Sequence, residues 1–108
     1  MKKEIKFTLD LDENFIPTSI DWTASEGAGL ETENVKAIMI SVWDPKENVA
    51  KRVDLWTKDM YVEEMKAMYF QTLMTMADGF ERATNEVDMA KEMRKFGEDF
   101  GKKMGILK

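Results

Sequence analysis

The feature that most constrains the fold is a change of period near the middle of the chain. Up to Trp56 the apolar residues come in short, strand-like patterns, whereas residues 61–84 repeat at the 3.6-residue period of a helix. Within this helix, residues 67–77 carry no charge over about three turns. Such a helix offers little surface to water, so we expect both of its sides to be covered.

Composition narrows the classes of function. The chain has 108 residues, 44% of them apolar and 34% charged, which indicates one folded domain. A net charge of −5 argues against general nucleic-acid binding, which needs a basic face. The sequence contains no cysteine and no histidine, which removes disulfides, thiolate metal sites and the commonest general base. We therefore expect no metal and no cofactor.

Four strands are predicted within residues 4–57. They cover residues 4–11, 17–24, 35–43 and 49–56, and a turn at Asp44-Pro45 separates the last two. Residues 25–34 have no period and are predicted to be a mobile loop. The third strand is apolar on both faces and is placed centrally, although it also fits a short helical stripe. No βαβ pattern is present, so the expected sheet is an antiparallel meander.

Two helices are predicted within residues 60–104, with Asp59 capping the first and Asn85 the second. The first has a main stripe at Val62, Met65, Tyr69, Leu73, Met76, Phe80 and Ala83; the stripe of the second is Met89, Met93, Phe96, Phe100 and Met104. The predicted fold class is α+β: a single domain, residues 1–108, in which a four-stranded antiparallel meander is followed by two C-terminal helices packed on it. Glycines recur every four residues along the second helix, which favours close backbone approach to the first helix or the sheet. They are Gly97, Gly101 and Gly105.

A second apolar strip on the first helix is the predicted partner-binding surface. Ten methionines occur in the chain, mostly on the two helices, and methionine is common on adaptable binding surfaces. The main stripes are expected to be core. The strip beside the first of them needs a cover of its own, which the second helix, another subunit of a homo-oligomer or a client chain could supply. We call this strip the shoulder: Ala67, Phe70, Met74 and Ala77.

The three tryptophans suggest an alternative site. Trp22, Trp43 and Trp56 lie on three different predicted strands and could share one sheet face. Burial in the core is the simpler interpretation, because each indole buries a large area. A tryptophan-lined pocket for a small molecule is the sharper one.

Acidic residues do not form a convincing site. Residues 10–14 begin like a calcium loop, but Phe15 stands where glycine is needed and Asp21 where glutamate is needed. Asp44, Asp54 and Asp59 flank turns and nothing else marks them. With no phosphate loop, nucleophile elbow or zinc motif in the sequence, we do not expect an enzyme.

Three blocks carry a resemblance to a known family. They read Ser-Val-Trp-Asp-Pro-Lys-Glu at 41–47, Asp-Leu-Trp-Thr-Lys-Asp-Met at 54–60, and Gln-Thr-Leu-Met-Thr-Met-Ala-Asp-Gly-Phe-Glu-Arg-Ala-Thr at 71–84. Together with the opening Glu-Ile-Lys-Phe, they resemble the gliding motility protein GldC of the Bacteroidetes over essentially the whole chain. Tyr61 departs from the proline expected there, which affects only helix initiation. The order of four strands and two helices is also similar to that of the export chaperone SecB, at the level of fold alone.

The resemblance implies an accessory protein of surface gliding, alongside machinery linked to the type IX secretion system, with no catalytic residues to carry over. The leading hypothesis is a non-enzymatic adaptor or chaperone-like factor that acts through protein contacts. The alternative is a small-molecule binding module. The longest apolar run, residues 37–40, is far too short for a membrane span, and the charged N-terminal residues are unlike a signal peptide. A cytoplasmic location is therefore expected.

Overall fold

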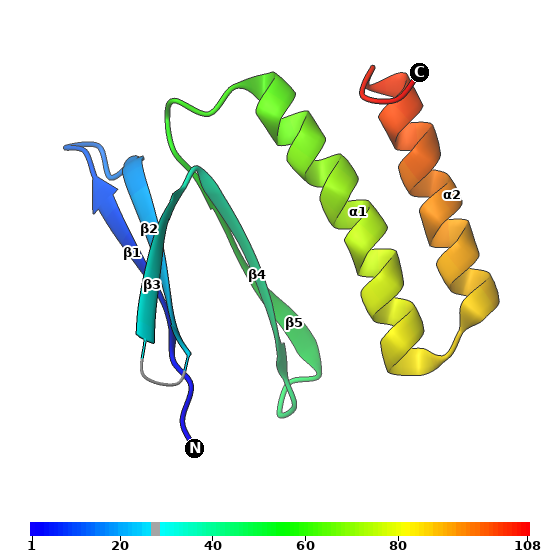
Figure 1. Ribbon diagram of the computed structural model, residues 1–108, viewed down its shortest axis with the longest axis horizontal. Coiled ribbons are helices and arrows are strands. Elements are labelled where there is room, and N and C mark those ends of the chain that lie inside the picture. Colours follow the sequence, from blue (N-terminus) through cyan, green and yellow to red (C-terminus); the bar gives the residue numbers. More distant parts are fainter. Residues whose placement is uncertain (27–28) are drawn as a thin grey trace. The chain divides into compact units, whose positions relative to one another are not determined.

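The computed structural model describes residues 1–26 and 29–108. Its elements, labelled in Figure 1, are β1 (Ile5–Leu11), β2 (Pro17–Glu26), β3 (Gly29–Val35), β4 (Ala37–Asp44), β5 (Val49–Trp56), α1 (Val62–Thr84) and α2 (Val87–Lys103). The chain forms two compact units, Met1–Met60 with the strands and Tyr61–Lys108 with the helices. Each unit is described by itself. The α+β class is confirmed, while the single domain and the packing of helices on the sheet stay predictions.

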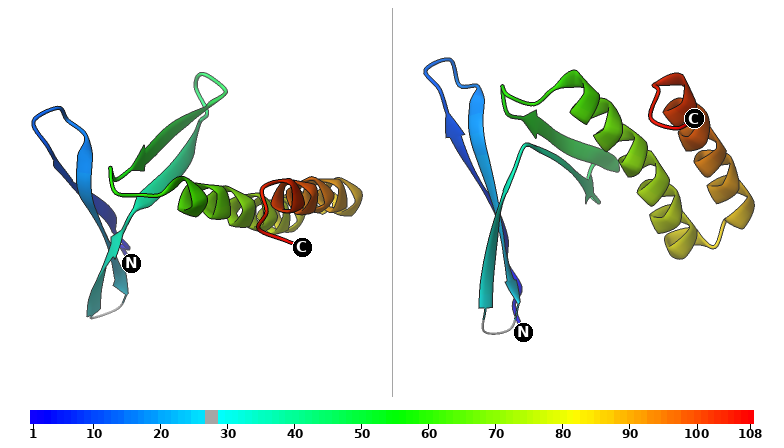
Figure 2. Two further views of the ribbon diagram at one scale, coloured as in Figure 1. Left: turned by 90° about the horizontal axis from the view of Figure 1, so that it is seen from above. Right: turned by 45° about the horizontal axis from the view of Figure 1, so that its top comes forward.

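The predicted single four-stranded sheet is wrong, because the strands divide into two antiparallel sheets. One has the order β1-β2-β3 and the other contains β4 and β5. Only Lys36, at a bend, separates β3 from β4. The third strand of the predicted meander is therefore longer than expected and bent, so its first half pairs with β2 and its second half with β5. Figure 2 shows the two sheets diverging where β3 passes into β4.

The loop predicted at residues 25–34 is also wrong for its described part, which includes β3 up to Asn34; residues 27 and 28 lie outside the described residues. Hydrogen bonds between polar side chains of β3 and β2 hold β3 in the sheet, where an apolar face would do so in an ordinary strand. Thr32 Oγ1 lies 3.0 Å from Thr23 Oγ1, and Asn34 Nδ2 donates to Asp21 Oδ1 at 2.9 Å. Because residues 31–34 are all polar, so that both faces of the strand carry polar residues, an analysis of hydrophobic period does not detect the strand.

The tight turn between β4 and β5 is confirmed. Asp44 Oδ1 accepts hydrogen bonds from the backbone N–H groups of Lys46 at 2.9 Å and Glu47 at 3.3 Å. Asn48 ends the turn with a φ of 56°, in the left-handed region that asparagine tolerates better than most residues. The turn therefore fixes the register of the hairpin, with Asp44 opposite Val49.

The two helices have the predicted extents but different caps. α1 has Tyr61 at its N-cap in place of Asp59, and Glu64 Oε1 accepts from the Tyr61 backbone N–H at 3.0 Å. Asn85 does not begin α2. It ends α1 in the left-handed conformation, with a φ of 60° and its N–H bonded to the Glu81 carbonyl at 2.8 Å. Asparagine is a common second choice to glycine at this position, which explains why it closes the first helix.

The strand unit buries few apolar side chains. Ile20 and Ile38 are buried, whereas the β4–β5 hairpin exposes Val42, Trp43, Val49, Val53 and Trp56. A two-stranded hairpin exposed in this way is marginally stable on its own in water. The strand unit therefore needs further apolar cover, from the rest of the chain or from another molecule.

Candidate functional site

The helical unit is an antiparallel hairpin in which glycines bring the two helices together (Figure 1). A Cβ atom on Gly97 would lie 2.6 Å from Met74 Sδ, and one on Gly101 would lie 2.8 Å from Phe70 Cε1. Phe70 and Met74 therefore fill the space left by the two missing side chains. The predicted close approach of the second helix is confirmed for these two glycines, and its target is the first helix.

The shoulder accordingly lies along this helix–helix contact. Phe70 and Met74 pack against α2, Ala77 is fully buried and Ala67 is half-buried. Of the three covers that the sequence leaves open, the structure places the second helix on Phe70 and Met74. Binding of a partner by the shoulder stays a prediction, but these side chains are already engaged within the chain.

An ion-pair network, which the sequence analysis did not find, links the same two helices. Arg94 Nη2 lies 2.9 Å from Asp78 Oδ1, and Arg94 Nη1 lies 3.0 Å from Glu81 Oε1. Two hydrogen bonds raise the pKa of Arg94, and the bond to Asp78 has a larger effect than the bond to Glu81. Arg94 stands 16 positions after Asp78 and 13 after Glu81, on the other side of the hairpin turn, so spacing along one helix could not show the contact.

The two predicted main stripes come together on one face of the hairpin. In each helix, exposed stripe residues stand one position before an interface residue: Tyr69 before Phe70 in α1, and Phe96 before Gly97 in α2. One position is a rotation of about 100° in a right-handed helix. Because the two helices run in opposite directions, this rotation carries both residues to the same side of the hairpin. We call this side the apolar face.

Side chains of the apolar face are not covered by the hairpin itself. Phe96 is 61% exposed, Val62 65% and Met76 50%. The exposed large members of the face are Val62, Tyr69 and Met76 from α1 and Met89 and Phe96 from α2; Met104, the C-cap of α2, is also exposed. The stripes were expected to be core, and within their own unit these members are open, whereas Leu73, Phe80, Met93 and Phe100 are half-buried.

The accessible area sets the scale of the missing contacts. The strand and helical units, each taken by itself, together expose at least 8724 Å². A compact chain of this mass exposes about 6,200 Å². The difference, about 2,500 Å², is in the range that permanent protein interfaces bury.

The tryptophans do not form a shared pocket. Trp43 pairs with Ala50 at one end of the β4–β5 hairpin and Trp56 with Ala37 at the other, about 20 Å apart at 3.4 Å per residue. Trp22 lies in the other sheet, opposite Phe7. The register therefore keeps Trp43 away from Trp56.

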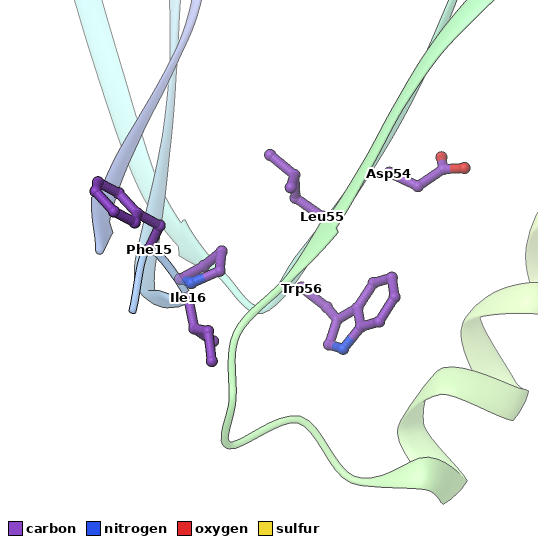
Figure 3. Close-up of a pocket in the computed structure, with 6 residues that line it drawn as sticks. Phe15, Ile16, Asp54, Leu55 and Trp56 are labelled. Carbon is purple, nitrogen blue, oxygen red and sulfur yellow. The ribbon is translucent and has the colours of Figure 1, made fainter. Parts of the chain in front are cut away.

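Of the three tryptophans, only Trp56 lines the hollow shown in Figure 3, whose volume is about 220 Å³. Leu55 points toward Phe15 and Ile16, while Trp56 leaves the strand on the other side. Phe15 is 81% exposed and has a φ of 62°, a strained backbone conformation for a bulky residue. The hollow is smaller than most small-molecule sites, which have about 300–1,000 Å³.

The carboxylates serve the turns of the strand unit. Asp12 Oδ2 binds Lys58 Nζ at 2.9 Å, and this hydrogen bond is the main cause that lowers the pKa of Asp12. A hydrogen bond from Thr57 lowers the pKa of Asp59 in the same way. Within residues 1–26 and 29–108, no three acidic side chains gather as a metal ion would require. The calcium-like segment thus contains a structural turn at Asp12.

A comparison with protein families gives a match over most of the chain. The family described as "Gliding motility-associated protein GldC-like" matches residues 17–106. This chain belongs to the GldC-like family. The match includes all three blocks that carried the resemblance. No curated protein and no solved structure matches the chain.

Family membership makes this a gliding motility-associated protein. In the part of the chain that the structure describes, neither helix is long and apolar enough to cross a membrane.

Proposed function

We propose that this GldC-like protein is a non-enzymatic accessory factor of the gliding machinery that binds another protein of that machinery through the apolar face. The observation that supports the proposal most directly is the merging of two methionine-rich stripes on one side of the hairpin. Family membership supplies the biological setting. A cytoplasmic location and a link to type IX secretion belong to the same proposal.

The chemistry of the apolar face suits protein binding. It combines flexible methionines, such as Met76 and Met89, with the large aromatic ring of Phe96. Thioether side chains adapt to irregular partner surfaces, and aromatic residues are enriched among those that dominate binding energy. Burying one such side chain contributes about 1.5–3 kcal/mol. Three or four of them contribute about 5–12 kcal/mol, which is of the same order as the cost of association.

The strand sheet of the same chain is the chief competitor for this face, since the sequence predicts helices packed on a sheet. An adaptor requires that the face, or a large part of it, stays available to the partner. The experiment must therefore separate loss of a partner from loss of the fold.

Affinity capture from a gliding bacterium tests this directly. The variant Met76→Glu/Phe96→Glu places two charges on the apolar face. Gln71→Glu/Lys91→Gln changes the net charge equally, and both of its positions stand one residue after an interface residue, on the opposite side of the hairpin. We expect the first variant to remain helical by circular dichroism and to lose a gliding component that the second retains. Retention of that component by both variants would refute the proposal, and so would unfolding of the first, because the face would then be internal core.

The small-molecule alternative is not favoured by a specific observation. The hollow beside Trp56 is small, and the other two tryptophans do not contribute to its lining. For an enzyme that uses a metal ion, the described residues likewise offer no group of ligands.

A further inference from the structure

Strand β1 is an edge of its sheet with a row of backbone groups that point outward. It pairs with β2 and with no other described strand. The Ser25 N–H donates to the Glu4 carbonyl at 3.1 Å, so the even-numbered residues of β1 bond to β2. The N–H and C=O groups of Ile5, Phe7 and Leu9 therefore face away from β2, in position to bond a further strand.

The usual protections of an edge strand are weak here. Proteins block such edges with proline, inward-pointing charges, several lysines or a central bulge. β1 contains no proline and one lysine, and its only irregularity lies at its end, between Asp10 and Leu11. Its charged side chains, Lys6 and Asp10, are exposed. The edge is thus open to pairing along most of its length.

The charge pattern of β1 is complementary to itself. When β1 is laid antiparallel against a second copy with Thr8 opposite Thr8, each Lys6 comes opposite an Asp10 of the other copy. The same register sets Phe7 opposite Leu9 as a hydrogen-bonded pair and Ile5 opposite Leu11, which are 58% and 49% exposed. Opposite charges directly across two strands stabilise pairing, and like charges destabilise it.

We propose that two copies of this chain associate through β1, antiparallel about a twofold axis at Thr8, to give a continuous six-stranded sheet. Such an arrangement is the closed, symmetric contact that most homodimers use. It also extends the apolar side of the sheet, where Phe7 and Trp22 stand opposite each other, across the dimer.

Two neighbouring pairs of charges bear on this register, and the second, acid opposite acid, opposes it. Lys6 Nζ lies 3.4 Å from Glu4, but both side chains are about two-thirds exposed, so this pair is weak and leaves Lys6 able to reach Asp10 of the second copy. Glu4 would stand opposite Asp12 just beyond the strand, where Asp12 is already bound to Lys58. The charges of β5, in contrast with Lys6 and Asp10 of β1, are paired within their own strand: Arg52 Nη2 lies 2.9 Å from Asp54 Oδ1.

A cysteine at the axis tests the geometry. The native chain has no cysteine, so Thr8→Cys introduces the only thiol. Thr8 opposite Thr8 is a non-hydrogen-bonded pair, in which Cα atoms are about 4.5 Å apart and a disulfide can form. Under mild oxidation of a micromolar solution, we expect Thr8→Cys to become a covalent dimer quickly and Ser41→Cys, an exposed control on β4, to stay mainly monomeric. Equal cross-linking of the two variants, or none at position 8, would overturn the proposal.

Charge exchange tests the register independently. Lys6→Glu places acid opposite acid, and Asp10→Lys places lysine opposite lysine, so each variant alone should dimerise roughly tenfold more weakly or worse than the native chain. An equimolar mixture should form a heterodimer, and the double variant should recover the homodimer, as measured by light scattering. Lys46→Glu in the exposed turn is the control for net charge. A native chain that is monomeric at every concentration, or a mixture that does not associate, would rule out this dimer; a foreign peptide would then be the better occupant of the edge.

Discussion

Substitution of Gly101 by alanine measures how closely the two helices approach. An added Cβ would lie 2.8 Å and 2.9 Å from two atoms of the Phe70 ring and 3.0 Å from Leu107 Cδ1. The ring is rigid, so the helices must separate or Phe70 must leave its rotamer. Overpacking of this kind costs about 1–3 kcal/mol.

The same substitution also brings a gain, because alanine favours a helix over glycine by about 1 kcal/mol. We therefore expect Gly101→Ala to be destabilising by about 0–2 kcal/mol in net terms. Gly79 in α1 supplies the matched control, since the nearest atom to its added Cβ is Arg82 Nη2 at 3.9 Å, an ordinary contact. Gly79→Ala should keep the whole gain of about 1 kcal/mol.

Urea unfolding followed by helical circular dichroism gives both values from one assay. The free energy of unfolding should be about 1–3 kcal/mol lower for Gly101→Ala than for Gly79→Ala. Gly97→Ala should fall between them, because the flexible thioether of Met74 can move out of the way. Equal stabilisation by all three substitutions would refute the glycine-mediated contact. Phe70 and Met74 would then be available to bind a partner.

Three further predictions concern stability. Hydrogen bonds from Lys58 to Asp12 and from Lys51 to Asp44 lower the pKa of both carboxyls. Their contribution to the free energy of unfolding is therefore present above about pH 4 and is lost as pH falls through the lowered values. Asp12→Asn should flatten the fall of the urea midpoint between pH 5 and 3. Phe15→Gly should raise the free energy of unfolding by about 1 kcal/mol, since the left-handed backbone at a φ of 62° costs a bulky residue about that much, and a lower value would show that the exposed ring makes a stabilising contact. Arg94→Gln should lower the melting temperature and make it less sensitive to salt, because it removes the ion pairs to Asp78 and Glu81; an unchanged salt dependence would contradict this role.

Much of the fold could be predicted from local patterns. Alternation identified β1, and the Asp44-Pro45 turn identified the hairpin whose two strands it joins. The helix stripes gave α1 and α2 to within a few residues. The bend at Lys36 was missed because no proline or glycine marks it, and β3 was missed because its cross-strand bonds are polar. Asn85 was assigned to the wrong helix because asparagine suits both ends.

The candidate site shows a different limit of sequence analysis. The glycines of α2 predicted a close contact, yet a one-dimensional pattern could not show that Phe70 and Met74 would fill it. That contact also decides which side of the hairpin stays open. The apolar face therefore exists only as a property of two helices together, and each stripe alone looks like ordinary core.

The measurement that tests the central claim most directly is site-specific photo-cross-linking in a gliding bacterium. A photoreactive phenylalanine analogue at position 96 reports what lies on the apolar face, and the same analogue at Lys91 reports the opposite side. The account predicts that position 96 cross-links to another protein of the gliding machinery and that position 91 does not. Cross-links from position 96 confined to the strands of the same chain would contradict it.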